Sequence, residues 1–286
     1  MKKINIVLFQ PAHPRFKIFD SYREVIDSLL WGLHSLGYQS RLFINEIDHN
    51  AVNIVFGWLP LFHMGTQDQL PANSILYSLE QYAATSMIGK PMLEAAAAHF
   101  QIWDYSLANI PIWQELNPKY PVYHAQVAFA PNLMRIPHDR PEDIDVLYIG
   151  SLGLKRAEKL ITCASAGYGT SLVSLSSIWG KQRDEFIGRS KLLLNISNEN
   201  PLLTIFEVVR ISYYLANRKA VVCELRPDTY IEPDLQQVLR FATPAELGNS
   251  CVELLEDPHL RTQYASDCFD VFSRRDVRDV IRGFFD

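Results

Sequence analysis

The chain has 286 residues, of which 48% are hydrophobic and 21% charged, and its formal net charge is −5. This length allows two small domains, and the composition is that of a globular protein rather than a disordered, collagen-like or coiled-coil chain. The acidic balance argues against a nucleic-acid-binding protein, because such a protein needs a basic face, whereas a diphosphate requires only a small basic pocket.

The amino-terminal residues give no sign of a targeting segment. The apolar stretch Ile4–Phe9 is short, and no small-residue cleavage site follows it, so we interpret it as a first strand rather than a signal peptide. No uninterrupted apolar run reaches the roughly 20 residues that span a bilayer. The four cysteines form no CxxC pair. Together these features predict a cytoplasmic protein with reduced thiols.

Short apolar strands alternate with helices through the first half of the chain, which predicts a parallel sheet with helices on both faces. The helix expected after the first strand has its apolar residues on one stripe and ends at Gly37. The expected strands are Ile4–Phe9, Arg41–Ile44, Val52–Phe56, Ser74–Leu79, Ile102–Tyr105 and Val122–Phe129. The expected helices are Ser21–Leu36, Pro91–Phe100 and Ile110–Leu116.

A polar stretch with three prolines, Pro131, Pro137 and Pro141, follows and marks a linker. A second series of strands and helices begins after it. Its expected strands are Asp145–Ile149, Ser171–Leu175, Leu192–Ile196 and Ala220–Cys223. Its expected helices are Lys155–Ala166, Lys181–Ser190, Ile205–Ala216 and Ala245–Leu255, with further helical sequence from about Pro258.

The two series predict an α/β protein with two Rossmann-like domains of similar size, 1–135 and 136–270, followed by a last helical segment, 271–286. In parallel sheets ligands bind beyond the carboxyl ends of the strands. We therefore expect the parallel sheets to face a central cleft, and that cleft to be the site.

The strongest local signal for a ligand site lies in the second half, where a strand ends at Asn195 and a helix is expected soon after. A helix N-terminus suits a diphosphate, because it presents free N–H groups and the positive end of the dipole. Glu207, in the expected first turn, can accept from a ribose diol, and Arg210 can donate to phosphate oxygens. The structural alternative is a glutamate that complements the dipole and pairs with Arg210. Asn195 joins Glu207 and Arg210 in the expected donor-binding set.

A second loop, Gly150–Gly153, also ends a strand and precedes a helix. Gly150 and Ser151 permit the close approach of a phosphate, and Arg156 follows in the helix. Ordinary turn chemistry is the alternative. Lys191 is a further candidate, as a cation that neutralises a leaving diphosphate or as a solvated lysine before a strand.

Candidate residues for a general base lie in the first half. Asp104 ends a strand at the expected cleft edge, where a carboxylate can remove a proton from a sugar hydroxyl, or it caps the next turn. His13 lies in the loop after the first strand and is either a base or a rigid loop residue between two prolines. Residues 58–62 (Trp-Leu-Pro-Leu-Phe) line an acceptor groove, form a membrane-facing patch or belong to the core.

Several motifs, taken together, resemble GT-B glycosyltransferases. Glu199 and Glu207 are separated by seven residues, which is similar to the donor-binding signature of the retaining members. Other runs resemble a group of bacterial GT-B-like proteins and occur in the same order as in that group. These runs are Ser78–Gln81, Ile102–Ile110, Asp145–Ser151, Gly180–Ile187, Ser190–Ile196 and Phe206–Ser212.

The resemblance implies a GT-B-like fold whose first domain binds the acceptor, whose second binds the nucleotide-sugar, and whose last helix packs back onto the first. It implies that Glu207 binds the nucleotide ribose and that Glu199 lies near the transferred sugar, as a catalytic residue. The sequence departs from the family between the two glutamates, which are usually joined by glycine-rich sequence. The group's typical Leu-Asn-Ile-His also becomes Leu-Asn-Ile-Ser, with Ser197 in place of a histidine.

The resemblance also bears on metals. Asp143 and Asp145 form a DxD triplet, which holds a divalent metal in another glycosyltransferase fold, but here it lies in a linker without a second ligand set. GT-B enzymes generally stabilise the departing diphosphate with protein cations and a helix end. We therefore expect no metal, and no cofactor other than the nucleotide-sugar substrate.

The sequence thus predicts a glycosyltransferase that moves a sugar from a nucleotide-sugar to a glycan or lipid-linked acceptor, in bacterial surface polysaccharide or glycoconjugate synthesis. Its expected partners are that donor and acceptor, with a peripheral membrane contact and without nucleic acid. The alternatives are a nucleotide-sugar epimerase or hydrolase of the same fold, and a non-catalytic sugar- or nucleotide-binding module. The sequence assigns neither the stereochemistry nor the oligomeric state.

Overall fold

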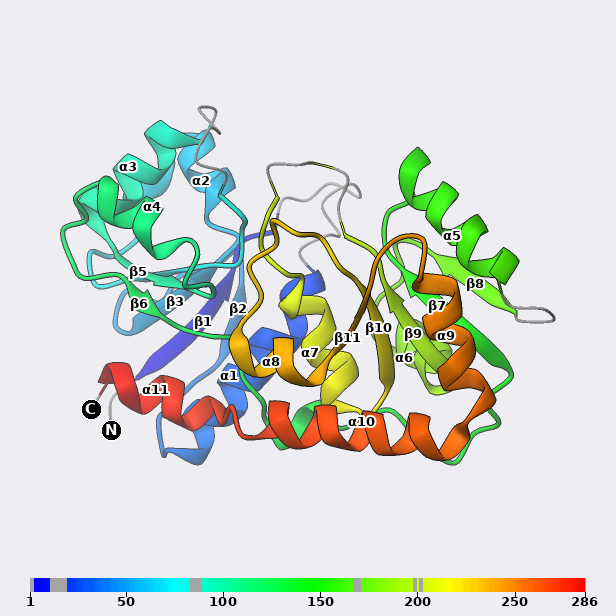
Figure 1. Cartoon of the computed structure of the whole chain (residues 1–286). Helices are drawn as coiled ribbons and strands as arrows, with labels where there is room; N and C mark the ends of the chain where they lie inside the picture. Colours follow the sequence, from blue (N-terminus) through cyan, green and yellow to red (C-terminus); the bar gives the residue numbers. More distant parts are fainter. Residues whose placement is uncertain are drawn as a thin grey trace. The chain divides into compact units, whose positions relative to one another are not determined.

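The computed structural model of the chain describes residues 3–10, 20–82, 89–166, 171–197, 200 and 203–285. They form two α/β units, whose elements are labelled in Figure 1. Unit 1 comprises Met1–Asn132 together with Asp276–Asp286, and unit 2 comprises Leu133–Arg275. The chain therefore leaves unit 1 once and returns to it for the last helix.

Unit 1 is built on a parallel sheet of six strands in the order β2-β1-β3-β4-β5-β6. All five residues of β1 are buried, which explains why this strand reads as a continuous apolar run rather than an alternating one. Ile4 lies opposite Val52 and Leu8 opposite Phe56 in the pairing with β3. The strands are β1 Ile4–Leu8, β2 Leu42–Ile44, β3 Val52–Phe56, β4 Ile75–Ser78, β5 Gln101–Asp104 and β6 Tyr123–His124.

The expected strand Val122–Phe129 is wrong in its length. Only Tyr123 and His124 pair with β5, and the backbone bond from Ala125 to the carbonyl of Asp104 is the last one along it. Further on, Phe129 instead pairs with Asp276, and its carbonyl accepts from the N–H of Val277 at 3.0 Å. A partner about 150 residues away in the chain therefore shortens this strand.

The helices of unit 1 carry much of its aromatic core. Trp58 is 2% exposed, and its ring packs edge-on against Phe62 with centroids 5.3 Å apart and lies 6.3 Å from Trp113. Of the three interpretations of residues 58–62, the structure confirms the one that places them in the core, because Trp58, Leu61 and Phe62 are buried. The helices are α1 Arg23–Ser35, α2 Leu59–His63, α3 Lys90–His99, α4 Ile110–Glu115 and α11 Val277–Phe285.

Helix α11 packs directly on α1. Gly32 makes this possible, because a Cβ at that position would lie 2.6 Å from Ile281 and 2.8 Å from Val277. Beyond α1, the ring of Phe284 packs against Trp103 with centroids 5.1 Å apart, and Tyr123 donates to the carbonyl of Val280 at 2.7 Å. The last helix is thus part of the core of unit 1.

Unit 2 is built on a second parallel sheet, in the order β11-β10-β9-β7-β8. The expected parallel α/β architecture is confirmed in both units. The edge strand β11 was not expected, because three residues carry too little periodic signal, and its pairing with β10 identifies it. The strands are β7 Ile144–Ile149, β8 Leu172–Leu175, β9 Ser190–Asn195, β10 Ala220–Glu224 and β11 Arg240–Ala242.

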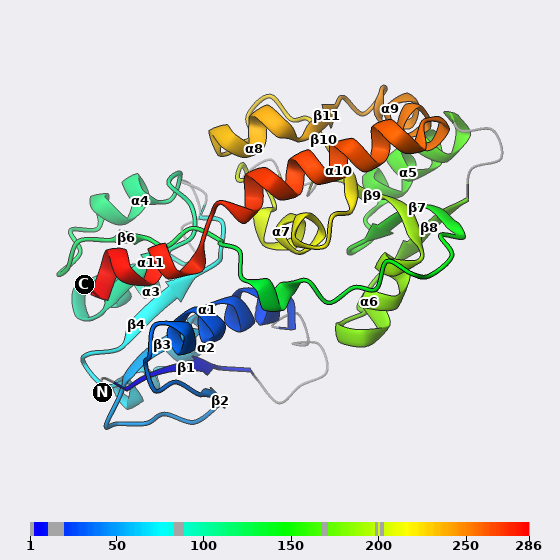
Figure 2. The ribbon, with the colours of Figure 1, turned by 90° about the horizontal axis from the view of Figure 1, so that it is seen from below.

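Two helices pack together over one face of the unit 2 sheet, as Figures 1 and 2 show for α5 and α9. Leu160 and Cys163 from α5 and Leu247 and Cys251 from α9 share one apolar cluster with the strands. Helix α10 contacts α7 and α8. The helices of unit 2 are α5 Leu154–Ala166, α6 Gly180–Gly188, α7 Val208–Ala216, α8 Pro233–Val238, α9 Leu247–Glu256 and α10 Pro258–Ser273.

Asp143 and Asp145, the DxD triplet, have separate cationic partners. Arg189 donates to Asp143 at 2.8 and 2.6 Å, and Lys191 donates to Asp145 at 2.7 Å. Within the described ranges, no group of three or more His, Cys, Asp or Glu side chains could hold a metal ion. The four cysteines are buried and unbridged. None of the helices in the described part of the chain is both long and apolar enough to span a bilayer.

Candidate functional site

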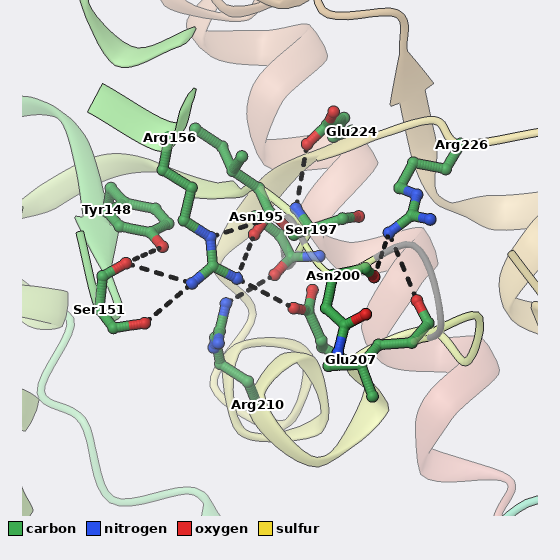
Figure 3. Close-up of polar contacts among 12 residues, drawn as sticks. Tyr148, Ser151, Arg156, Asn195, Ser197, Asn200, Glu207, Arg210, Glu224 and Arg226 are labelled. Carbon is green, nitrogen blue, oxygen red and sulfur yellow. Dashed lines mark hydrogen bonds and ion pairs between the residues drawn. The ribbon is translucent and has the colours of Figure 1, made fainter. Parts of the chain in front are cut away.

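A cluster of charged and polar side chains gathers at the carboxyl ends of β7, β9 and β10 in unit 2 (Figure 3). Strands β7 and β10 both pair with β9, so their carboxyl ends meet at one edge of the sheet. This edge is where a parallel α/β sheet binds its ligands. The residues come from the ends of the strands and from the first turns of α5 and α7.

Arg156, in the first turn of α5, is at the centre of the cluster although it is only 4% exposed. Its Nε donates to the carbonyl of Ser197 at 3.1 Å, and Nη1 donates to the carbonyl and hydroxyl of Ser151 at 3.1 and 2.9 Å. Nη2 donates to the carbonyl of Ile196 at 3.2 Å and pairs with the carboxylate of Glu207 at 3.5 Å. One buried cation therefore joins the loop after β7, the loop after β9 and Glu207.

Glu207 lies one residue before α7, not inside its first turn as expected. The backbone before it is extended, because Phe206 and Thr204 exchange backbone hydrogen bonds with Tyr230, at 3.0 and 2.6 Å. That tertiary pairing delays the helix to Val208 and leaves Glu207 as its N-cap residue, without a side-chain cap bond. The carboxylate points instead toward Arg156 and is 16% exposed.

Arg210, half-buried in the first turn of α7, reaches the end of β9. Its Nη1 donates to Oδ1 of Asn195 at 3.0 Å. Its Nε and Nη2 make no hydrogen bond with any described residue. Burial acts to lower the pKa of the guanidinium, but the Glu207 carboxylate and neighbouring tyrosines raise it, and the net pKa lies above its usual value. Arg210 is thus a permanent cation with donors to spare at the sheet edge.

Asn195 has a buried donor without a partner. The side chain is fully buried at the end of β9, and Arg210 has only donors, so Oδ1 must face Arg210 and Nδ2 must point away from it. No described residue accepts from this Nδ2. A buried amide nitrogen without an acceptor costs free energy, on the order of 1–3 kcal/mol, so among the described residues Asn195 stands out as an unsatisfied donor at this edge.

Two residues of the cluster were missed by sequence reasoning. Glu224, the last residue of β10, accepts from the N–H of Ser197 at 3.0 Å and forms a short ion pair with Lys159 of α5. The signal was present in the sequence, because Glu224 directly follows the apolar run Ala220–Cys223 and hence lies at the carboxyl end of a strand. Arg226 contacts the next part of the loop, at the carbonyls of Leu203 (3.3 Å) and Asn200 (3.5 Å).

The loop after β7 has a packing constraint of its own. A Cβ on Gly150 would lie 2.5 Å from the hydroxyl of Tyr148, so a larger residue here would force the Tyr148 ring to shift. The same hydroxyl donates to the carbonyl of Ser151 at 3.2 Å. Gly150 and Ser151 thus lie at the expected edge of the sheet, where Ser151 accepts from Arg156.

Lys191 is not brought to this cluster. It lies near the amino end of β9, four residues before Asn195, which corresponds to roughly 13 Å along the strand. Its ammonium pairs with Asp145 at 2.7 Å, also near a strand start. The structure therefore does not place Lys191 beside the other expected donor-binding residues, because a parallel sheet separates the two ends of its strands.

The acceptor-side candidate Asp104 is fully buried at the end of β5. Its carboxylate accepts from the N–H of Ser106 at 2.9 Å, from Nδ2 of Asn109 at 3.0 and 3.2 Å, and from Nε1 of Trp113 at 2.8 Å. Burial raises the pKa of Asp104 to about 7, although these hydrogen bonds act to lower it. The structure thus shows Asp104 in the other role expected for it, because the enclosed carboxylate holds the turn after β5 together. His13 and Glu199, the other two catalytic candidates, lie outside the described residues.

The chain was compared with known proteins by sequence. No family model matches the chain. The uncharacterized protein L140 of Acanthamoeba polyphaga mimivirus is 23% identical over 251 residues, which cover 86% of this chain and 79% of that protein. The similarity thus extends over most of both chains and carries no assignment of an activity.

Solved structures extend the comparison. HepE of Anabaena, in complex with UDP and glucose, is 12% identical with a TM-score of 0.64, and the match covers 99% of this chain and 98% of that one. AviGT4, a glycosyltransferase involved in avilamycin A biosynthesis, is 11% identical with a TM-score of 0.58, and the match covers 98% of each chain. At these identities the similarity establishes the architecture: the chain has the GT-B fold, with two α/β units that are each built on a parallel sheet.

Proposed function

We propose that this protein is a glycosyltransferase whose nucleotide-sugar donor binds at the carboxyl edge of the unit 2 sheet. The observation that carries the proposal is the convergence of Arg210, Asn195 and Glu207 at that edge, with donors on Arg210 and Asn195 that no described residue satisfies. Phosphate and ribose supply the missing acceptors, and the Glu207 carboxylate accepts from a ribose diol. The GT-B fold and the UDP bound to HepE support this assignment.

Nucleotide binding is the first test. Thermal shift with UDP, GDP, dTDP, ADP and CMP should show stabilisation by a nucleoside diphosphate, about 2.7 kcal/mol at 100 times its dissociation constant. UDP is the first choice because HepE holds it. Arg210→Gln and Glu207→Gln should each weaken binding about 10- to 100-fold, because each removes a charge-assisted hydrogen bond.

The matched control is Glu253→Gln, which removes a surface carboxylate of α9 that pairs with Arg240. It should bind the nucleotide as the wild type does. If no nucleotide stabilises the folded wild type, or if all three variants bind equally well, the donor site is not at this edge.

An assay of glycosyl transfer is the second test. We propose transfer of the sugar to a hydroxyl of a glycan or lipid-linked acceptor, of the kind used in surface polysaccharide and glycoconjugate synthesis, at a membrane surface or in the cytoplasm. Arg210 then stabilises the charge of the departing diphosphate, and no metal is required. Incubation of the matching nucleotide-sugar with a panel of such acceptors should yield a glycosylated product, with the same rate in excess EDTA.

The controls of this assay separate the alternatives. Conversion or hydrolysis of the donor to the same extent without acceptor identifies an epimerase or hydrolase. Tight nucleotide binding with no turnover on any acceptor identifies a binding module. Loss of transfer in EDTA, with recovery on adding a divalent cation, contradicts the metal-independent mechanism.

A further inference from the structure

The two residues that follow β9, Ile196 and Ser197, are held by one buried cation and one buried anion. Arg156 donates to the carbonyl of Ile196 at 3.2 Å and to that of Ser197 at 3.1 Å. Glu224 accepts from the N–H of Ser197 at 3.0 Å. We propose that Arg156 and Glu224 are positioning residues that form a charged clamp on this dipeptide and act on the donor only through Glu207. This proposal rests on the donor site proposed above.

The hydrogen bonds of Arg156 are the reason for assigning it a positioning role. A guanidinium has five N–H groups, and those of Arg156 make at least five contacts with described residues, to three carbonyls, one hydroxyl and one carboxylate. A phosphate contact would therefore require one of these bonds to break. Arg210 differs, because its Nε and Nη2 are uncommitted within the described chain. The two arginines of the cluster thus have different tasks.

Glu224 completes the clamp from the neighbouring strand. Its carboxylate is 2% exposed, and it pairs with Lys159, which lies one turn beyond Arg156 on α5. Helix α5 therefore acts on both backbone groups of Ser197. Arg156 donates directly to its carbonyl, and Lys159 pairs with the Glu224 carboxylate that accepts from its N–H. A buried pair of this kind adds little net stability, and removing one partner leaves an unpaired buried charge. Such a pair is better explained by the geometry it fixes than by the stability it adds.

The clamp determines where Glu207 points. Arg156 is the described cation within 4 Å of the Glu207 carboxylate, and the same guanidinium fixes the backbone at Ile196 and Ser197. Loss of the clamp should therefore disturb the ribose contact of Glu207, and leave the phosphate contact of Arg210 in place. A direct phosphate ligand would produce the opposite pattern.

The test measures the dissociation constants of UDP and uridine, by calorimetry, for the wild type, Arg156→Lys and Arg210→Lys. The quantity compared is the ratio of the uridine constant to the UDP constant. For Arg156→Lys the clamp predicts that the dissociation constants of both ligands increase by a similar factor, about tenfold. The ratio of the two constants should therefore stay as in the wild type. For Arg210→Lys this ratio should fall, because only the binding of UDP becomes weaker. A fall in the ratio for Arg156→Lys, with uridine unaffected, would make Arg156 a phosphate ligand and overturn the proposal.

A second variant covers the case in which Arg156→Lys does not fold. Ser151→Ala removes one acceptor of Arg156 at the surface end of the guanidinium and should weaken UDP and uridine equally, by a smaller factor. Weakening of UDP alone contradicts the clamp.

Amide exchange at Ser197 tests the clamp without any ligand. The Ser197 amide should be strongly protected in the wild type and in Glu224→Gln, whose Oε1 still accepts, and should lose most of its protection in Glu224→Ala. Fast exchange of this amide in the wild type overturns the clamp, whatever the protein binds. Protection as expected, with no binding of UDP or uridine by the wild type, upholds the clamp and rejects the proposed donor site.

Discussion

Asp104 shows how a residue with the chemistry of a base becomes a structural residue. Its four hydrogen bonds come from a turn that includes Ser106 and Asn109 and from the indole of Trp113, and none of its surface reaches solvent. The sequence placed it correctly at the end of a strand. Only the packing of α4 over that end, through Trp113, encloses the carboxylate.

Asp104 should make the stability of unit 1 depend on pH. Burial raises its folded pKa to about 7 from 3.8, so between these values the folded chain holds a proton that the unfolded chain does not. The stabilisation of the folded chain by this proton is therefore complete below about pH 4 and is lost as the pH rises through 7. The total loss in the free energy of unfolding is on the order of 4 kcal/mol. Urea unfolding of the wild type and Asp104→Asn at pH 5, 6, 7 and 8 measures this.

Tryptophan fluorescence is a suitable signal, because four of the five tryptophans lie in unit 1: Trp31, Trp58, Trp103 and Trp113. The unfolding free energy of the wild type, relative to that of Asp104→Asn, should fall from pH 5 to about pH 7 and level off toward pH 8. A difference that is constant over this range would show that Asp104 ionises normally in the folded state.

At the scale of elements, α11 shows that a helix can pack in a unit whose other elements lie far from it in the sequence. Its apolar side faces α1, where Gly32 allows contact with Val277 and Ile281, and its last residues extend the aromatic cluster around Trp103. The strong segregation of apolar and charged residues along this helix indicates one buried side, but not the surface that covers it.

Ile281→Ala should destabilise unit 1 by about 2–5 kcal/mol, because it removes a fully buried side chain from the contact of α11 with α1. Arg282→Ala is the matched control on the exposed side of the same helix, and its effect should stay within about 0.5 kcal/mol. Urea unfolding followed by tryptophan fluorescence measures both. Equal stability of Ile281→Ala and wild type would show that α11 is not docked on unit 1 in solution.

The start of helix α7 is a second feature that the local sequence pattern does not predict. Its apolar periodicity continues back to Ile205, and the sequence therefore favours a helix from that point. The pairing of residues 204–206 with Tyr230 overrides this preference, and the helix begins at Val208. The change of three residues moves Glu207 from a helical turn to the cap position, from which its carboxylate reaches Arg156.

At the scale of the whole molecule, the polar cluster belongs to unit 2 alone. Gly150, Ser151, Arg156, Asn195 and Glu207 all lie between Leu133 and Arg275, as does Arg210. The nucleotide-binding and clamp experiments therefore report on one unit, whereas the Asp104 and Ile281 experiments report on the other. This separation lets a loss of binding be distinguished from a loss of stability in unit 1.

The sequence by itself determined the architecture. Buried parallel strands read as continuous apolar runs and the helices between them as amphipathic stretches, so the two α/β halves and most of their elements follow from local pattern. It also placed Asn195, Glu207 and Arg210 near the end of one strand, because parallel topology brings every strand's carboxyl end to the same edge.

Only the tertiary structure decided which of these residues have donors to spare. Arg156 and Arg210 look alike as basic residues at two helix starts. Arg156 donates to three carbonyls, whereas the guanidinium of Arg210 has one hydrogen-bond partner among the described residues. For the same reason, only the fold shows that Lys191 pairs with Asp145, that Asp104 is enclosed beside Trp113, and that Glu224 pairs with Lys159 beside Ser197. Hydrogen-bond satisfaction depends on which backbone groups the fold brings within about 3 Å, and local sequence pattern does not contain that information.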